Sequence, residues 1–228
     1  MNLLAIDTST DRATVAIAVN GDIYSEEQQG LRQHAQLLLP MIDRLLAMSQ
    51  LSCSQLDAIV FGCGPGSFTG LRIACSVAKG LAYAHDLPVY PVSSLAAIGF
   101  DVYQTEKSLA SHTNVLTLID ARMQQVYWSF YTGPEFNTKE HVTAAADIVV
   151  PVSDSIILAG AGFESYTSHL PQVLQRAIIK QCPIFPNARA MIGLVKSGKI
   201  SAVTAEEALP VYVRNQVAQV SSKGELHG

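Results

Sequence analysis

Charged residues are scarce in this sequence: Lys, Arg, Asp and Glu make up 15% of the 228 residues, against about a quarter in a typical soluble domain. Hydrophobic residues reach 49%, so we expect part of the apolar surface to be covered by another protein chain. No apolar run approaches the roughly 20 residues that a membrane-spanning helix needs. The N-terminal stretch contains Asp7 and no basic cluster, which is unlike a signal peptide. These features predict a soluble, cytoplasmic protein with no membrane partner.

Basic residues are also few, and they are scattered along the chain. The formal net charge is −4, whereas nucleic-acid binders usually concentrate Lys and Arg on one face. The four cysteines form no C-x-x-C pair and the six histidines form no H-E-x-x-H pair, which disfavours a zinc site or disulfides. We therefore predict buried, reduced thiols, no metal site built from a local motif, and only indirect contact with any nucleic acid.

A repeated plan is what the sequence does contain. A strand ending at Asp7 is followed by a polar turn and an alternating strand over Thr14–Val19, and a strand ending at Asp120 is followed by the same arrangement. Two continuous apolar runs close on spaced glycines, in "AIVFGCGPGS" and "SIILAGAGFES". Alternating runs suit strands near an edge, and continuous runs suit central strands. We predict a duplicated α/β fold with two lobes, residues 1–102 and 103–228.

Two predicted helices of the first lobe have more apolar surface than one sheet would cover. They span His34–Met48 and Gly70–Ala84, and a helix packed on a sheet needs only a stripe of about 100°. The excess predicts contact with a partner subunit. The predicted interface residues are Leu37, Leu38, Met41, Ile42, Leu45, Leu71, Ala74, Val77, Ala78 and Leu81.

The stretch "GCGPGSFTG", between a strand and the second of these helices, raises the question of phosphate binding. It lacks the lysine of a P-loop and the spacing of a dinucleotide-binding loop, although a helix N-terminus attracts anions. Asp7 could hold a magnesium-bound phosphate or could order its own turn, and both alternatives stay open. The candidate nucleotide or anion site, where ATP or ADP would bind weakly, consists of Asp7, Thr8, Gly64, Gly66, Ser67 and Thr69. We favour a loop that shapes the strand-to-helix turn.

Five segments together resemble one family: "LLAIDTST", "RQHAQLLLP", "GCGPGSFTGLRI", "LIDARMQQVYW" and "PVYVRN". In this order, and over nearly the whole chain, they are similar to the bacterial tRNA threonylcarbamoyladenosine biosynthesis family TsaB, also called YeaZ. The resemblance implies the duplicated fold of actin, hexokinase and Hsp70, in which each lobe has a mixed β-sheet flanked by helices.

The same resemblance implies a role within a complex. Members of the family pair with a related catalytic subunit, TsaD, through the helices of the first lobe, and a small ATPase, TsaE, joins them. The complex transfers a threonylcarbamoyl group from threonylcarbamoyl-adenylate to N6 of adenosine 37 in tRNA. The resemblance implies that a TsaB-like subunit contacts the tRNA only indirectly, through the complex. Homodimers through an overlapping surface are also implied.

The catalytic relative carries an H-x-x-x-H metal pair, and this sequence has Ser94 and Ile98 at the matching positions. Serine is a poor metal ligand and isoleucine is none. We therefore predict a non-catalytic subunit with no cofactor, metal or catalytic residue. One alternative is a nucleotide-binding or ATP-hydrolysing enzyme of the sugar-kinase-like fold, which would use Asp7 and the loop 64–69; a peptidase has almost no support. Arg122 is expected to pair with a carboxylate.

Overall fold

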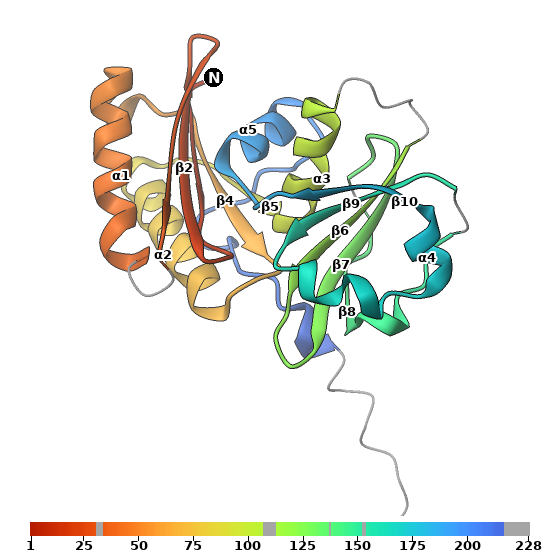
Figure 1. The fold of residues 1–228 in the computed structure, drawn as a ribbon. Coiled ribbons are helices and arrows are strands. Elements are labelled where there is room, and N and C mark those ends of the chain that lie inside the picture. The colour runs from red at the N-terminus through yellow and green to blue at the C-terminus, as the bar shows by residue number, and fades with distance from the viewer. Residues whose placement is uncertain (31–33, 107–112, 137, 152–153, 217–228) are drawn as a thin grey trace, which may run out of the picture.

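Two five-stranded mixed sheets form the framework of the protein (Figure 1). The computed structural model describes residues 1–30, 34–106, 113–136, 138–151 and 154–216, so Arg32 and Gln33 of the "RQHAQLLLP" segment lie outside the described residues. The first sheet has the order β3-β2-β1-β4-β5. Its strands are β1 (Leu3–Asp7), β2 (Arg12–Val19), β3 (Asp22–Gln29), β4 (Ala58–Gly64) and β5 (Val89–Ser93).

The second sheet repeats this plan in the order β8-β7-β6-β9-β10. Its strands are β6 (Asn114–Asp120), β7 (Gln125–Thr132), β8 (His141–Ala144), β9 (Ile156–Ala161) and β10 (Ile178–Pro183). In each sheet the first strand pairs antiparallel with the second and parallel with the fourth. The predicted duplicated α/β fold is therefore confirmed.

The strand pattern follows from burial. Every residue of β4 and of β9 is buried, as their continuous apolar runs predict. β3 is exposed at alternate positions and forms an edge. The turn between β2 and β3 is made by Asn20 and Gly21, whose φ angles of 51° and 95° are left-handed, as a two-residue hairpin requires.

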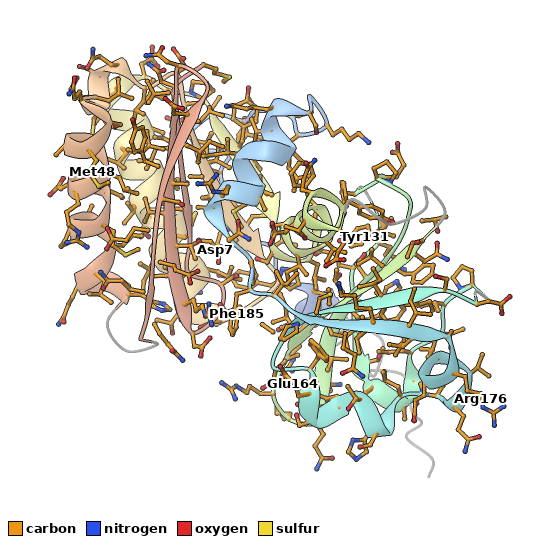
Figure 2. The ribbon with its side chains drawn as sticks, turned by 45° about the horizontal axis from the view of Figure 1, so that its top comes forward. Asp7, Met48, Tyr131, Glu164, Arg176 and Phe185 are labelled. Atoms are coloured by element: carbon orange, nitrogen blue, oxygen red, sulfur yellow. The ribbon has the colours of Figure 1, made fainter. Side chains whose placement is uncertain are left out.

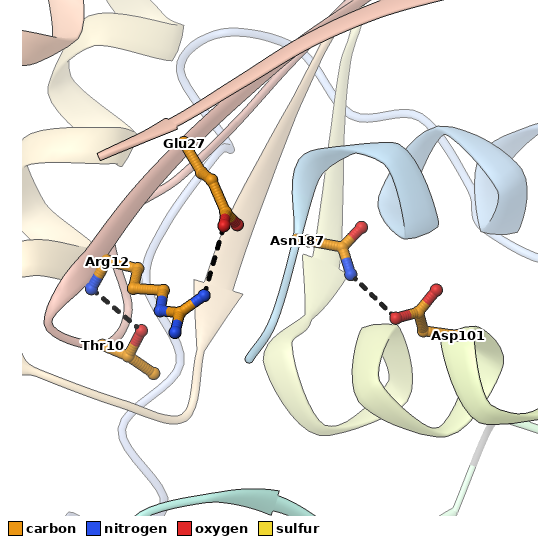
Figure 3. Close-up of polar contacts among 5 residues, drawn as sticks. All are labelled: Thr10, Arg12, Glu27, Asp101 and Asn187. Carbon is orange, nitrogen blue, oxygen red and sulfur yellow. Dashed lines mark hydrogen bonds and ion pairs between the residues drawn. The ribbon is translucent and has the colours of Figure 1, made fainter. Parts of the chain in front are cut away.

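Two helices lie between the sheets and are exchanged between the halves of the chain (Figure 1). Helix α3 (Ser94–Thr105) packs on β6 of the second sheet, and α5 (Ala188–Lys196) packs on β1, β2 and β4 of the first. The Asn187 side chain caps α5 by accepting from Ala190 N at 2.8 Å, and it donates to Asp101 of α3 at 3.2 Å (Figure 3). One core therefore joins both sheets, and the division after residue 102 stays a prediction.

The remaining helices cover the outer faces of the sheets. Helices α1 (His34–Ser49) and α2 (Phe68–His85) lie on the outer face of the first sheet, and α4 (Gln172–Ala177) lies outside the second (Figure 1). The two predicted helices of the first lobe are thus confirmed to within two residues at each end. Short 3₁₀ helices occupy Cys53–Gln55, Ala145–Asp147, Glu164–His169 and Val213–Gln216.

The predicted partner interface needs correction. Seven of its ten side chains are buried within this chain, each at most 2% exposed: Leu38, Met41, Ile42, Leu45, Leu71, Ala74 and Ala78. All of them except Leu71 belong to the core beneath α1 and α2. The prediction is wrong for these seven because the chain itself already covers them. Leu37, Val77 and Leu81 are half-buried and reach the surface.

Three of the four thiols are buried as predicted. All four cysteines are free, and Cys63, Cys75 and Cys182 are buried, whereas Cys53 is half-buried and the prediction is wrong for it. Burial raises the pKa of the Cys63 thiol to about 12, which keeps it protonated and unreactive. In the described part of the chain, every helix is too short or too polar to cross a lipid bilayer.

Candidate functional site: a cleft where the two sheets meet

A cleft of about 660 Å³ opens where the carboxyl ends of β1, β4, β6 and β9 converge. This is the edge at which α/β folds bind ligands, and the volume is typical of a small-molecule site. Its walls are the β1–β2 turn, the N-terminus of α2, the β6–β7 turn and residues 211–214. Both lobes therefore contribute to it.

Asp7 lies at this junction but inside the protein (Figure 2). Its side chain is 0% exposed, and Oδ1 accepts from Ser9 N at 3.0 Å and Ser9 Oγ at 2.8 Å. Oδ2 has no hydrogen-bond partner among the described residues, and a Cβ added at Gly62 would lie 1.8 Å from it. Burial raises the pKa of Asp7 to about 7, against the opposing effect of the Ser9 hydrogen bonds. These contacts support the turn-ordering role.

The glycine-rich loop is pressed against the β1–β2 turn. Ser67 N donates to Ser9 O at 2.7 Å, and Thr8 Oγ1 donates to Gly70 O at 2.7 Å. A Cβ at Gly66 would lie 2.3 Å from Ser9 O, and a Cβ at Gly70 would lie 1.8 Å from Thr8 O. These two glycines are therefore required by a protein backbone that already occupies the space above the loop.

The candidate nucleotide site is only partly assembled. Gly66, Ser67 and Thr69 line the cleft, and Ser67 caps α2 by accepting from Gly70 N. The other three residues do not line it: Asp7 and Thr8 are 0% exposed, and Gly64 packs so that a Cβ would lie 2.8 Å from Val211 O. The prediction is corrected for these three, because the turn and the C-terminal segment bury them. Weak ATP or ADP binding stays a prediction for the rest.

The β6–β7 turn forms the opposite wall. Arg122, Met123 and Gln124 have φ angles of 61°, 52° and 59°, a run of left-handed backbone that non-glycine residues rarely adopt. Asp120 Oδ1 accepts from Arg122 N and from the Tyr166 hydroxyl, both at 2.8 Å. The Arg122 guanidinium lies 3.2 Å from Asp120 Oδ2. The expected pairing of Arg122 with a carboxylate is confirmed, and that carboxylate is Asp120.

A C-terminal strap, residues 209–214, crosses from one lobe to the other. Val211 N donates to the Cys63 carbonyl of β4 at 2.7 Å. The Tyr212 hydroxyl accepts from Arg72 Nε at 3.1 Å, and Arg214 donates to Ala121 O at 2.7 Å. In the sequence, "PVYVRN" indicates the family resemblance but not this position. The strap's position depends on partners more than 90 residues away, which no local pattern reveals.

Beyond the strap lies a second cavity of about 540 Å³, which Val211 and Val213 share with the first. It contains Glu140, which accepts from the Ser93 hydroxyl. Burial raises the pKa of Glu140 to about 7, while the Ser93 hydrogen bond opposes the shift.

The two positions that match the H-x-x-x-H metal pair of the catalytic relative lie in α3. Ser94 and Ile98 are both 0% exposed, and Ile98 belongs to the core between the sheets. Among the described residues, no three His, Cys, Asp or Glu side chains gather closely enough to hold a metal ion. The predicted absence of a metal stays a prediction, and these two side chains offer no ligand pair.

Gly70 and Gly80 make a testable contrast within α2. Gly70→Ala is expected to lower the free energy of unfolding by about 3 kcal/mol, because the new Cβ forces the Thr8 backbone to move. Gly80→Ala should raise it by about 1 kcal/mol, because a Cβ there meets no described atom within 4 Å and alanine favours the helix. Urea unfolding of both variants checks this, and changes of equal sign would contradict it.

The repeated sheet plan, the shared helical layer and the cleft at the carboxyl ends define a protein of the actin, hexokinase and Hsp70 fold. A sequence profile described as TsaD, tRNA N6-adenosine threonylcarbamoyltransferase, matches residues 21–205. The tRNA threonylcarbamoyladenosine biosynthesis protein TsaB of Haemophilus influenzae is 34% identical over 95% of each chain, and that of Escherichia coli is 32% identical over 96% of each. The structure of YeaZ from Pseudomonas aeruginosa is 36% identical, with a TM-score of 0.80 over 92% of this chain and 99% of that one. The chain belongs to the TsaB family, also called YeaZ, as the five segments predicted.

Proposed function

We propose that the chain takes part in the biosynthesis of threonylcarbamoyladenosine in tRNA as a non-catalytic subunit. It pairs with a TsaD-like catalytic chain, and a TsaE-like ATPase joins the pair. The names of the TsaB relatives support the pathway. The missing metal ligands at Ser94 and Ile98, together with a glycine loop closed by the chain's own backbone, support the non-catalytic part.

The outer surface of α1 and α2 is the observation that carries the proposal. Leu39 and Tyr83 are 51% and 76% exposed there, and α2 adds half-buried apolar side chains at Ile73, Val77 and Leu81. Aromatic residues are enriched at protein interfaces. This surface, which we call the outer helical face, suits a protein partner.

Gly80 strengthens this argument. It is exposed inside α2, and apart from its chain neighbours and the nearby backbone of its own helix no described atom lies within 4 Å of where its Cβ would be. Glycine inside a helix costs about 1 kcal/mol relative to alanine, and no close packing within this chain explains why a glycine stands there. The close approach of a partner helix would explain it, because glycine has no side chain in the way.

Reconstitution tests the proposed function. The chain is purified with the TsaD-like and TsaE-like proteins of the same organism and assayed on an unmodified tRNA transcript with threonylcarbamoyl-adenylate as donor. Modification should require this chain, and the chain alone should neither modify tRNA nor hydrolyse ATP. Full modification without it, or ATP turnover by the chain alone, would contradict the proposal, and the latter would favour the sugar-kinase-like alternative.

A further inference from the structure

Two arginines lie over aromatic rings at the mouth of the cleft. The Arg72 guanidinium carbon is 3.8 Å from the centroid of the Phe68 ring, and that of Arg12 is 4.0 Å from the centroid of Phe185. Both rings line the cleft, and Phe185 is labelled in Figure 2. Among the described residues these are the only two such pairs, so the feature is particular to this site.

Phe68 is the more accessible of the two rings. It is 54% exposed at the first turn of α2, and its centroid lies 5.3 Å from that of Tyr212 in the strap. Arg72 donates to the Tyr212 hydroxyl at 3.1 Å. These three side chains, which we call the aromatic platform, hold one another in place and leave ring surface open to solvent.

Arginines without a carboxylate partner lie at the cleft. Arg12 is paired with Glu27 (Figure 3), and Arg122 with Asp120. In the described part of the chain, Arg72 and Arg214 make no ion pair with a carboxylate. Asp11 is the one carboxylate on the cleft wall without such a pair. Of these two arginines, Arg214 lines the cleft, and Arg72 lies beside it over the Phe68 ring.

We propose that the aromatic platform binds an unstacked nucleotide of single-stranded RNA, so that this subunit contacts the tRNA directly. The inference rests on the proposed function and adds a contact to it. Proteins bind unpaired RNA bases by stacking them on aromatic rings and guanidinium planes, and Arg72 and Arg214 attract the phosphate. A cleft of about 660 Å³ has room for one nucleotide. An acidic peptide would use the charges but not the ring faces.

The test uses a fluorescent anticodon stem–loop RNA with unmodified A37 and the complex of this chain with its TsaD-like partner. Phe68→Ala and Arg72→Ala are each expected to weaken RNA binding about tenfold in fluorescence anisotropy. Arg72→Ala should also reduce the slope of log K against log salt by about one. The controls on α4, Val173→Ala and Arg176→Ala, change an exposed apolar residue and an exposed arginine away from the cleft and should alter neither quantity.

The outcomes separate the two proposals. If the complex forms and modifies tRNA while both variants bind RNA with unchanged affinity and salt slope, the aromatic platform is wrong and the proposed function stands. If the wild-type chain forms no complex, both fail. A photo-crosslink from 4-thiouridine beside A37 into residues 68–72 or 209–214 supports the platform. Crosslinks confined to the catalytic chain, or a partner protein found seated over the cleft, overturn it.

Discussion

A chain carrying Gly80→Gln is expected to fold normally and to lose its TsaD-like partner. A Cβ at this exposed position meets open space in the isolated chain, and glutamine is a better helix former than glycine. In the complex it would fill the space that a closely packed partner helix needs. A clash at the centre of an interface matches the loss of a hot-spot residue, so affinity should fall by at least about 30-fold. Calorimetric titration against the catalytic chain measures this.

Two further variants serve as controls for that result. Val173→Gln places the same side chain on α4, at a residue 64% exposed, and should leave affinity unchanged. Leu38→Asp, the substitution that the sequence pattern alone suggests, would bury a carboxylate at a position 0% exposed and lower the free energy of unfolding by more than about 4 kcal/mol. Loss of binding in that variant would therefore reflect unfolding. Unchanged affinity of Gly80→Gln would remove the outer helical face from the interface.

The comparison of Leu38 with Leu39 shows what a sequence pattern can and cannot predict. Strands and helices are readable because burial on one or both faces leaves a period in the chain, and α1 begins at His34 as predicted. The period does not say which apolar positions the chain covers itself. Leu38 is covered by the sheet, whereas its neighbour Leu39 is 51% exposed. Only the folded arrangement separates a core residue from an interface residue.

For the candidate site, the sequence likewise predicts where the residues lie but not what they do. Asp7 and the glycine loop fall at carboxyl ends of strands, which topology alone brings together. Their roles depend on long-range contacts: Asp7 Oδ2 against Gly62, and the Thr8 backbone against Gly70. The position of the strap is harder still to predict from the sequence, because Tyr212 contacts Arg72, 140 residues away in the chain. Composition likewise concealed the arginines of the cleft, which are scattered in the chain and gathered only by the fold.

The variant Asp7→Asn is expected to avoid a loss of stability that the wild-type chain undergoes as pH rises. Burial raises the pKa of Asp7 from its ordinary 3.8 to about 7, so between these values the folded chain holds a proton that the unfolded chain has released. Stability from this group is complete below about pH 4 and is lost as pH rises through about 7. The loss amounts to about 4 kcal/mol. Asparagine keeps an oxygen for Ser9 and carries no charge at any pH, so the variant escapes that loss.

Urea unfolding of the wild-type chain and Asp7→Asn at pH 4.5 and at pH 8 measures the effect. The variant's stability relative to the wild type should rise by about 3 kcal/mol between the two pH values, since part of the full effect is already lost at pH 4.5. Glu140 and every other titrating group are common to both chains and cancel. Asp43→Asn, at an exposed position on α1, should show no such change. If instead magnesium and ATP stabilise the wild type and Asp7→Asn abolishes that gain, Asp7 serves a nucleotide, and the carboxylate is part of a working phosphate site within the fold.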